Sequence, residues 1–329
     1  MSTANGGARS VMSREDGFTI IEMMVATTLL MVVCGVVMRG VFGLTDVSRM
    51  VSNRTDMHNA VRNATELLTQ EIGQAGRISL PGKITLAASA LKGTNVLTVN
   101  TTAATGNATA GIFLNEILLV GADDSQEPVV VQSWTANTIT LTDTLANDHI
   151  GVVPVQAVGG FREGVIPPTV ANGSTANVLK IFGDIHDDGK LVYVEYICDQ
   201  DGARLYRTSL PYNAGAKVAP TVEQILIDNI EHNPVDPGTG VETPCFTYQT
   251  QTVVGQPFVV DVAVTLTIHS QARDKNTNDF QRETKALLNV SPRNVFNVWE
   301  QASLGLSERV QPTPTEVAQL LPALVTGQY

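Results

Sequence analysis

The stretch REDGFTIIEMMVATTLLMVVCGVVMRG, residues 14–40, determines the fold class predicted for this chain. From Phe18 to Met38 it contains a single charged residue, Glu22. At 1.5 Å per residue this run forms a helix about 31 Å long, which is enough to cross the hydrocarbon core of a membrane. A carboxylate in such a segment costs about 2.5–3.5 kcal/mol on insertion scales, so Glu22 is a candidate functional residue.

Two ordinary interpretations explain the apolar run only in part. A cleaved secretory signal has an apolar region of about 7–15 residues and a small-residue cleavage site, whereas this run is longer and CGVVMRG is a poor processing site. A simple membrane anchor explains the length, with Glu22 close to the interface. It does not explain the junction between Gly17 and Phe18, or the position of Glu22 behind that junction.

The segment DGFTIIE, residues 16–22, resembles the class III signal of type IV pilins and of the pseudopilins of type II secretion. The resemblance implies that a prepilin peptidase removes a leader, residues 1–17, by cutting after Gly17. Phe18 would become an N-methylated N-terminus and Glu22 the fifth mature residue. Glu22 would then be an assembly residue that pairs with the Phe18 amine of a neighbouring subunit. An unpaired buried charge is strongly unfavourable, so this pairing would set the stagger between subunits.

The helix is expected to continue beyond the membrane as a spine over residues 18–80. Apolar residues recur at intervals of three and four on one face: Met57, Val61, Ala64, Leu68, Ile72 and Ala75. No proline occurs before Pro81, and Gly76 together with Pro81 supplies stop signals. This pattern predicts that the second half of the helix packs on the chain's own head.

Two regions rich in β-prone runs follow the helix. Residues 84–158 contain short runs separated by turns and resemble a structural β module of bacterial surface and phage-related proteins. In residues 159–298 the order of runs resembles the head of PilW-type minor pilins, with Arg293-Asn294 near its end. The predicted fold class is therefore α+β: a type IV pilin fold, with a helical spine on an antiparallel sheet and an additional all-β insertion.

The C-terminal tail, residues 299–329, is marked by prolines: Pro312, Pro314 and Pro322. Thr313 to Glu316 have the pattern of an N-cap and a capping box, which predicts one short helix. We expect this tail to be mobile. The alternative is a peptide that docks on a partner.

The cysteines divide into one within the apolar helix and two in the head. Cys34 is expected to act as a small buried hydrophobe. Cys198 and Cys245 fall where the pilin resemblance places them outside the cytoplasm, in an oxidising compartment. A bridge between them would contribute about 4 kcal/mol in the chain-entropy model, and two free buried thiols are the alternative. Neither belongs to a zinc site, because no second Cys or His lies at ligand spacing.

The segment DIHDDGKLVYVE, residues 184–195, has the spacing of a calcium loop. Asp184, His186 and Asp188 occupy loop positions 1, 3 and 5, and Glu195 occupies position 12. His186 stands where an oxygen ligand belongs. A turn between two strands, with Asp and Gly selected for turn geometry, is the alternative. Calcium is a tentative cofactor, and no other is expected.

The sequence carries no enzyme signature and no footprint of a nucleic-acid binder. A P-loop, G-x-S-x-G, H-E-x-x-H and Rossmann motifs are absent from it. The net charge is −11, and no stripe of Lys and Arg interleaved with aromatic residues occurs. The pilin resemblance, together with a head that is awkward to repeat in a thin fibre, implies a non-enzymatic minor pilin that primes assembly of a type IV pilus or sits at its tip. A minor pseudopilin of a type II secretion system and a pilus-borne adhesive module are the alternatives.

The pilin resemblance also implies partners and a location. The expected partners are other pilins, contacted through the N-terminal helix, the prepilin peptidase and the inner-membrane assembly platform. The chain would sit in the inner membrane with a periplasmic head before assembly, and in the extracellular pilus (fimbrium) afterwards.

Overall fold

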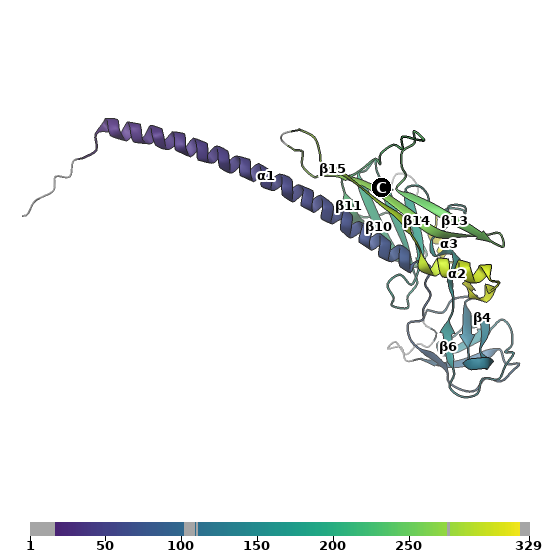
Figure 1. Ribbon diagram of the computed structural model, residues 1–329. Coiled ribbons are helices and arrows are strands. Elements are labelled where there is room, and N and C mark those ends of the chain that lie inside the picture. Colours follow the sequence, from purple (N-terminus) through teal and green to yellow (C-terminus); the bar gives the residue numbers. More distant parts are fainter. Residues whose placement is uncertain (1–16, 102–108, 110, 275–276, 323–329) are drawn as a thin grey trace, which may run out of the picture. The chain divides into compact units, whose positions relative to one another are not determined.

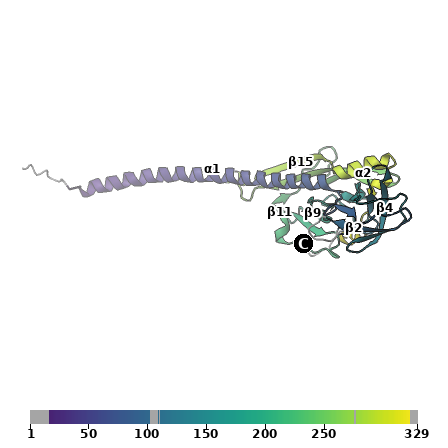
Figure 2. The same cartoon turned by 90° about the horizontal axis from the view of Figure 1, so that it is seen from below.

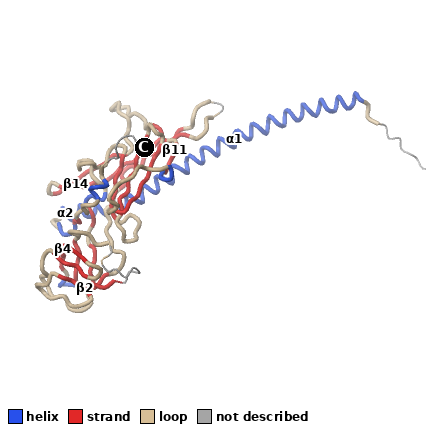
Figure 3. The backbone as a smooth tube through the Cα atoms, turned by 180° about the vertical axis from the view of Figure 1, so that it is seen from behind, coloured by secondary structure: helices blue, strands red, loops and turns tan. Residues whose placement is uncertain are grey.

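A long helix is followed by a part of the chain that consists mainly of strands and loops (Figure 3). The computed structural model describes residues 17–101, 109, 111–274 and 277–322. The chain divides into two compact units, residues 1–53 and 54–329, and the boundary falls within the helix. The fold class is α+β, as predicted, with antiparallel sheets behind the helix and an additional β domain.

Helix α1 (Ile20–Gln74) is continuous in both views of the ribbon (Figures 1 and 2). Within the described residues it is the helix that is long and apolar enough to cross a membrane. The helix ends at Gln74 and not near residue 80, because Gly76 adopts φ +80° and its N–H donates to the carbonyl of Phe182 at 2.8 Å. A left-handed residue just behind the last turn is a common helix stop.

The second half of α1 carries the predicted apolar stripe, and that stripe is buried. None of its members is more than 6 % exposed: Met57, Val61, Ala64, Leu68, Ile72 and Ala75. They belong to one hydrophobic cluster with residues of the head sheets, among them Tyr196 and Val262. The stripe at helical spacing is therefore confirmed as the face that packs on the head.

The next strands close into a barrel in the order β1-β2-β5-β4-β3-β6. They are β1 (Ile84–Leu86), β2 (Val96–Thr101), β3 (Ile117–Val120), β4 (Glu127–Trp134), β5 (Thr138–Leu141) and β6 (Pro154–Ala157). A short 3-10 helix, η1 (Asp123–Ser125), precedes β4. Thr85 of β1 pairs with Pro154 of β6, so the strands that enter and leave the barrel lie side by side. The inward side chains, such as Leu97 and Val131, form a core of their own.

The head contains two sheets, whereas the sequence had predicted one. The first has the order β11-β10-β9-β8, with β8 (Val178–Gly183), β9 (Val192–Asp199), β10 (Arg204–Pro211) and β11 (Ile225–Asp228). The second is centred on β14 (Gln256–His269), which pairs with β12 (Ile230–Glu231), β13 (Phe246–Val253) and β15 (Arg282–Val290). Asn229, with φ 65°, turns the chain between β11 and β12. The run of residues 225–231 therefore contributes β11 to the first sheet and β12 to the second.

The C-terminal segment is packed on the protein as far as Leu321, so the expected mobile tail is wrong over this range. It forms α2 (Arg293–Ser303), η4 (Ser307–Arg309), β16 (Val310–Gln311) and α3 (Val317–Leu320). Strand β16 pairs in parallel with β7 (Gly160–Phe161), which is followed by η2 (Arg162–Gly164); η3 (Val222–Gln224) precedes β11. Val317 and Leu320 are buried in a cluster with Phe113 and Phe182. Residues 323–329 of the predicted tail lie outside the described residues.

Asn294, singled out in the sequence as part of the Arg293-Asn294 pair, closes the C-terminus of α1. Its side-chain Nδ2 donates to carbonyl oxygens of the last turn, at 3.4 Å to Gly73, 3.2 Å to Gln74 and 3.4 Å to Ala75. The last carbonyls of a helix have no partner within the helix. A residue of α2 therefore caps α1.

Candidate processing and assembly site

The junction between Gly17 and Phe18 lies in front of α1. Gly17, Phe18 and Thr19 are not helical, and Phe18 is 85 % exposed. A peptidase needs an accessible peptide bond outside regular structure, because intact helical hydrogen bonds keep the backbone out of a cleft. The predicted cleavage position meets both conditions.

Glu22 caps the N-terminus of its own helix. The Thr19 N–H donates to Glu22 Oε2 at 3.0 Å, and the Glu22 N–H donates to Thr19 Oγ1 at 3.3 Å. The Thr19 hydroxyl also donates to Oε2, at 3.1 Å. These reciprocal bonds form a capping box, in which two helix-terminal donors are satisfied together. This role was not predicted from the sequence, although the pattern T-x-x-E before an apolar run signals it.

The capping role and the proposed assembly role of Glu22 are compatible. Both hydrogen bonds that its carboxylate accepts use Oε2, and within the described residues Oε1 accepts none. An amine can therefore approach Oε1 while the cap stays intact. The N-terminus of a helix also favours a negative charge, which suits a carboxylate at this position.

The N-terminal region matches a known family model. Residues 12–38 match the model described as the prokaryotic N-terminal methylation motif. The chain carries the methylation motif of type IV pilin-like proteins. No curated protein and no solved structure gives a significant match. The match identifies a pilin-like N-terminus, and it does not assign a subtype such as PilW.

Cys34 lies in the apolar part of this pilin-like helix as a free cysteine. Its side chain is exposed in the chain by itself. A membrane or neighbouring subunits around α1 would supply the burial expected for Cys34.

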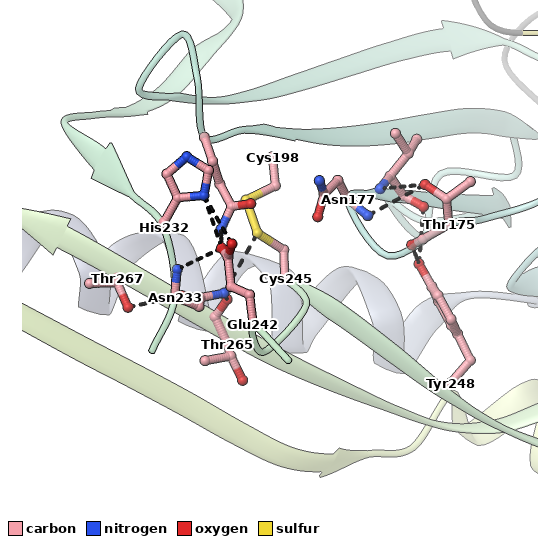
Figure 4. The surroundings of a disulfide bond; sticks show 12 residues. Thr175, Asn177, Cys198, His232, Asn233, Glu242, Cys245, Tyr248, Thr265 and Thr267 are labelled. Carbon is pink, nitrogen blue, oxygen red and sulfur yellow. Dashed lines mark hydrogen bonds and ion pairs between the residues drawn. A yellow bond between two sulfur atoms is a disulfide. The ribbon is translucent and has the colours of Figure 1, made fainter. Parts of the chain in front are cut away.

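Cys198 and Cys245 form a disulfide bond between the two head sheets (Figure 4). Cys198 is in β9, Cys245 immediately precedes β13, and their Cα atoms are 6.5 Å apart. Both side chains are almost completely buried. The bond therefore links the sheet of β8–β11 to the sheet of β12–β15 within the common core.

A polar cluster surrounds the disulfide (Figure 4). Glu242 accepts bonds from the Asn233 N–H at 3.1 Å and from Gln200 Nε2 at 3.0 Å. His232 Nδ1 lies 3.1 Å from the same carboxylate, and Asp201 lies on the other side of the ring. The hydrogen bond to Glu242 and the negative charges raise the pKa of His232. Protonated His232 thus stabilises the folded state. This stabilisation is lost as the pH rises through the pKa of His232.

The proposed calcium ligands are not brought together. Asp184 is buried and accepts bonds from the N–H groups of Asp188 at 3.1 Å and Gly189 at 3.2 Å, which is the geometry of a turn. Glu195 is fixed in β9, where its Oε2 lies 2.6 Å from Lys217 Nζ. The exposed side chain of His186 adds no third ligand, and the described residues hold no metal-binding group of three such side chains. The turn alternative agrees with the structure.

A buried ionic contact, missed from the sequence, fixes the pilin-like spine on the head. Glu71 of α1 is 4 % exposed and accepts bonds from Arg207 Nε at 3.1 Å to each oxygen. Arg207 Nη2 and the Tyr196 hydroxyl donate to the same carboxylate. A polar residue within an apolar stripe was the available signal, but its partners lie more than a hundred positions away in sequence.

Proposed function

We propose that this chain is a minor pilin. A prepilin peptidase would cleave it between Gly17 and Phe18, Phe18 would be N-methylated, and the mature chain would enter a type IV pilus through α1. The methylation motif over residues 12–38, placed directly at the start of a helix long enough to span a membrane, carries this proposal.

The size of the head supports a minor position, at the tip or in priming. The barrel of β1–β6 is added to the two head sheets. A head of this bulk is difficult to repeat along a thin fibre, whereas one copy at an end meets no such limit. Its partners would then be other pilins around α1, together with the prepilin peptidase and the inner-membrane assembly platform. The head would be periplasmic before assembly and extracellular in the fimbrium.

A minor pseudopilin of a type II secretion system is the second candidate, because the same N-terminal motif serves both machines. Surface fibres purified from cells separate the two. A minor pilin is present in them at a low ratio to the major subunit. Absence from surface fibres, together with a loss of protein secretion when the chain is deleted, favours the pseudopilin.

Processing is tested by mass spectrometry of the mature protein. We expect a chain that begins at Phe18 and carries one methyl group on its amine. A Gly17→Leu variant, which alters the residue before the cut, should retain its leader. A wild-type chain that begins at Met1, or one that is cut behind Cys34, would contradict the proposal.

A further inference from the structure

Strand β13 forms the border of its sheet, beside β14 (Figure 1). Its first residues are covered: the Phe246 N–H donates to the Ala176 carbonyl at 2.8 Å, and the Tyr248 hydroxyl donates to the Thr175 carbonyl at 3.0 Å. Within the described part of the chain, residues 249–253 make backbone pairs with β14 alone. The second half of β13 is thus an open sheet edge.

This open edge lacks the usual protection against pairing. Natural edge strands carry charges or prolines, are bulged, or are covered by other segments. From Cys245 to Val260 the chain contains no charged residue. The register shift between Gln249 and Thr250 leaves Val260 of β14 without a partner and inserts no residue into β13, and the pairing is regular from there to the hairpin tip. The side chains of residues 249–252 are exposed, and Val254 at the tip is 93 % exposed.

The register shows which backbone groups face outward. Val254 and Gly255, with φ 50° and 76°, form the two-residue turn of the β13–β14 hairpin. The flanking pair, Val253 and Gln256, is then hydrogen-bonded, and pairs alternate along the ladder. The N–H and C=O groups of Thr252 and Thr250 therefore point away from β14. The residue opposite Thr252 is Pro257, which has no N–H to donate. This agrees with a non-hydrogen-bonded pair at Thr252.

We propose that this edge pairs with the same edge of a second copy of the chain. Antiparallel pairing about a two-fold axis at Gln251 places Thr250 opposite Thr252 of the copy, so all four outward-facing groups of each strand find partners. Opposed Thr and Gln side chains are compatible in such pairs. Two copies that each carry a net charge of −11 repel one another, and this uncharged edge adds nothing to that repulsion at the contact. The surface lies outside α1 and the methylation motif, so it stands apart from the proposed function.

A cysteine at the axis tests the pairing directly. In the proposed register Gln251 faces Gln251 of the copy as a non-hydrogen-bonded pair, with Cα atoms about 4.5 Å apart. That separation lies within the range of about 4.4–6.8 Å that a disulfide needs. The full chain in detergent, with Cys34→Ala to remove the free thiol, should form a disulfide-linked dimer when it carries Gln251→Cys. Thr247→Cys, an exposed position in the covered half of the same strand, should cross-link at least about tenfold less.

A proline provides the second measurement. Thr252→Pro removes an outward N–H but no bond to β14, so the fold, followed by circular dichroism, should be unchanged. Because the N–H is lost from each copy, cross-linking at residue 251 should fall about tenfold. Thr252→Val, which keeps the N–H, should cross-link like the parent. Equal cross-linking at residues 247 and 251, or cross-linking that survives Thr252→Pro, would overturn the proposal. A dimer whose disulfide is located by peptide mapping at a residue other than 251 would also overturn it.

Discussion

At the scale of single residues, Glu22 has a local role in the capping box with Thr19 and a proposed role in assembly. Glu22→Gln separates them, because Gln can take the same place in a capping box but carries no charge. We expect cleavage behind Gly17 and membrane insertion to persist. Fibre incorporation should fail, because a neighbour's buried amine would lose its counter-charge, at a cost of about 3–5 kcal/mol. The measurement is the amount of processed chain in purified fibres.

Thr19→Ala is the matched control, since it removes the cap but keeps the charge. It should weaken the first helical turn and leave incorporation close to the wild-type level. If Glu22→Gln enters fibres as well as the wild type does, the pairing role of Glu22 is rejected, while the methylation motif is unaffected.

Glu116 is a buried carboxyl group in front of β3 of the barrel. It is fully buried, Oε1 has no hydrogen-bond partner within the described residues, and Oε2 accepts a bond from the Phe113 N–H at 3.2 Å. Burial raises the pKa of Glu116 from 4.5 to about 8, although the Phe113 bond opposes the shift. The folded state therefore keeps a proton that the unfolded state releases, and stability falls as the pH rises between these two values.

Glu116→Gln should remove that pH dependence. Gln keeps the acceptor for the Phe113 N–H and cannot ionise, so we expect it to stabilise the protein by about 1–3 kcal/mol at pH 7, after the cost of an unpaired amide. At pH 4 that advantage should vanish. Denaturant unfolding, followed by tryptophan fluorescence, to which Trp134 of the barrel contributes, gives the free energy of unfolding at each pH. Equal slopes against pH in the two proteins would contradict the assignment.

At the scale of elements, the contact between Glu71 and Arg207 fixes α1 on the sheet of β8–β11. Arg207→Met should destabilise the head by about 3–5 kcal/mol, because it leaves the Glu71 carboxylate buried without a counter-charge. The double variant Glu71→Gln/Arg207→Met should recover much of this loss, since a neutral Gln still accepts the Tyr196 hydroxyl. Thermal and denaturant unfolding of the single and double variants measure the coupling.

The exposed pair of Arg62 and Glu66 on the same helix is the control for this experiment. Their atoms are 2.8 Å apart, and the side chains are 76 % and 57 % exposed. Arg62→Met should cost less than about 1 kcal/mol, as exposed pairs do. A double variant at Glu71 and Arg207 that is no more stable than Arg207→Met would show that packing, and not charge, dominates that site.

At the scale of the whole head, Gln311 joins the C-terminal segment to the barrel. Its Nε2 donates to the carbonyls of Ile117 at 2.7 Å and Val158 at 2.6 Å, and its Oε1 accepts the Ile117 N–H at 2.9 Å. The residue is 1 % exposed. One side chain thus pairs with the backbone of Ile117, the first residue of β3, as a neighbouring strand would.

Gln311→Ala should loosen this attachment without unfolding the barrel, whose core is independent. It leaves the buried backbone groups of Ile117 and Val158 without partners, at about 1–3 kcal/mol for each buried group. Hydrogen exchange at Ile117 should accelerate about tenfold or more. Gln319 is an exposed residue of α3, so Gln319→Ala should leave hydrogen exchange unchanged. An unchanged exchange rate at Ile117 in Gln311→Ala would show that Gln311 does not hold the C-terminal segment on the barrel.

The sequence by itself determined the features that depend on neighbouring residues. The methylation motif, the apolar segment and the stripe from Met57 to Ala75 are each defined by residues that are close together in sequence. The helix and the inward face of its stripe could therefore be predicted. The strand-forming runs were located for the same reason, and the match over residues 12–38 agrees with the predicted junction at Gly17 and Phe18.

Only the tertiary structure decided how those elements pair. Closure of the barrel, the turn at Asn229 that divides the head into two sheets, and the packing of the tail through Gln311 all depend on contacts between distant segments. Alternation within a strand specifies which side chains face a core, but it does not specify which strand lies beside it. For the same reason Glu195, at the correct spacing for calcium, is held by Lys217 in a strand, and Glu71 meets Arg207. Spacing along a chain determines local geometry, whereas the partners of a buried charge are set by the fold.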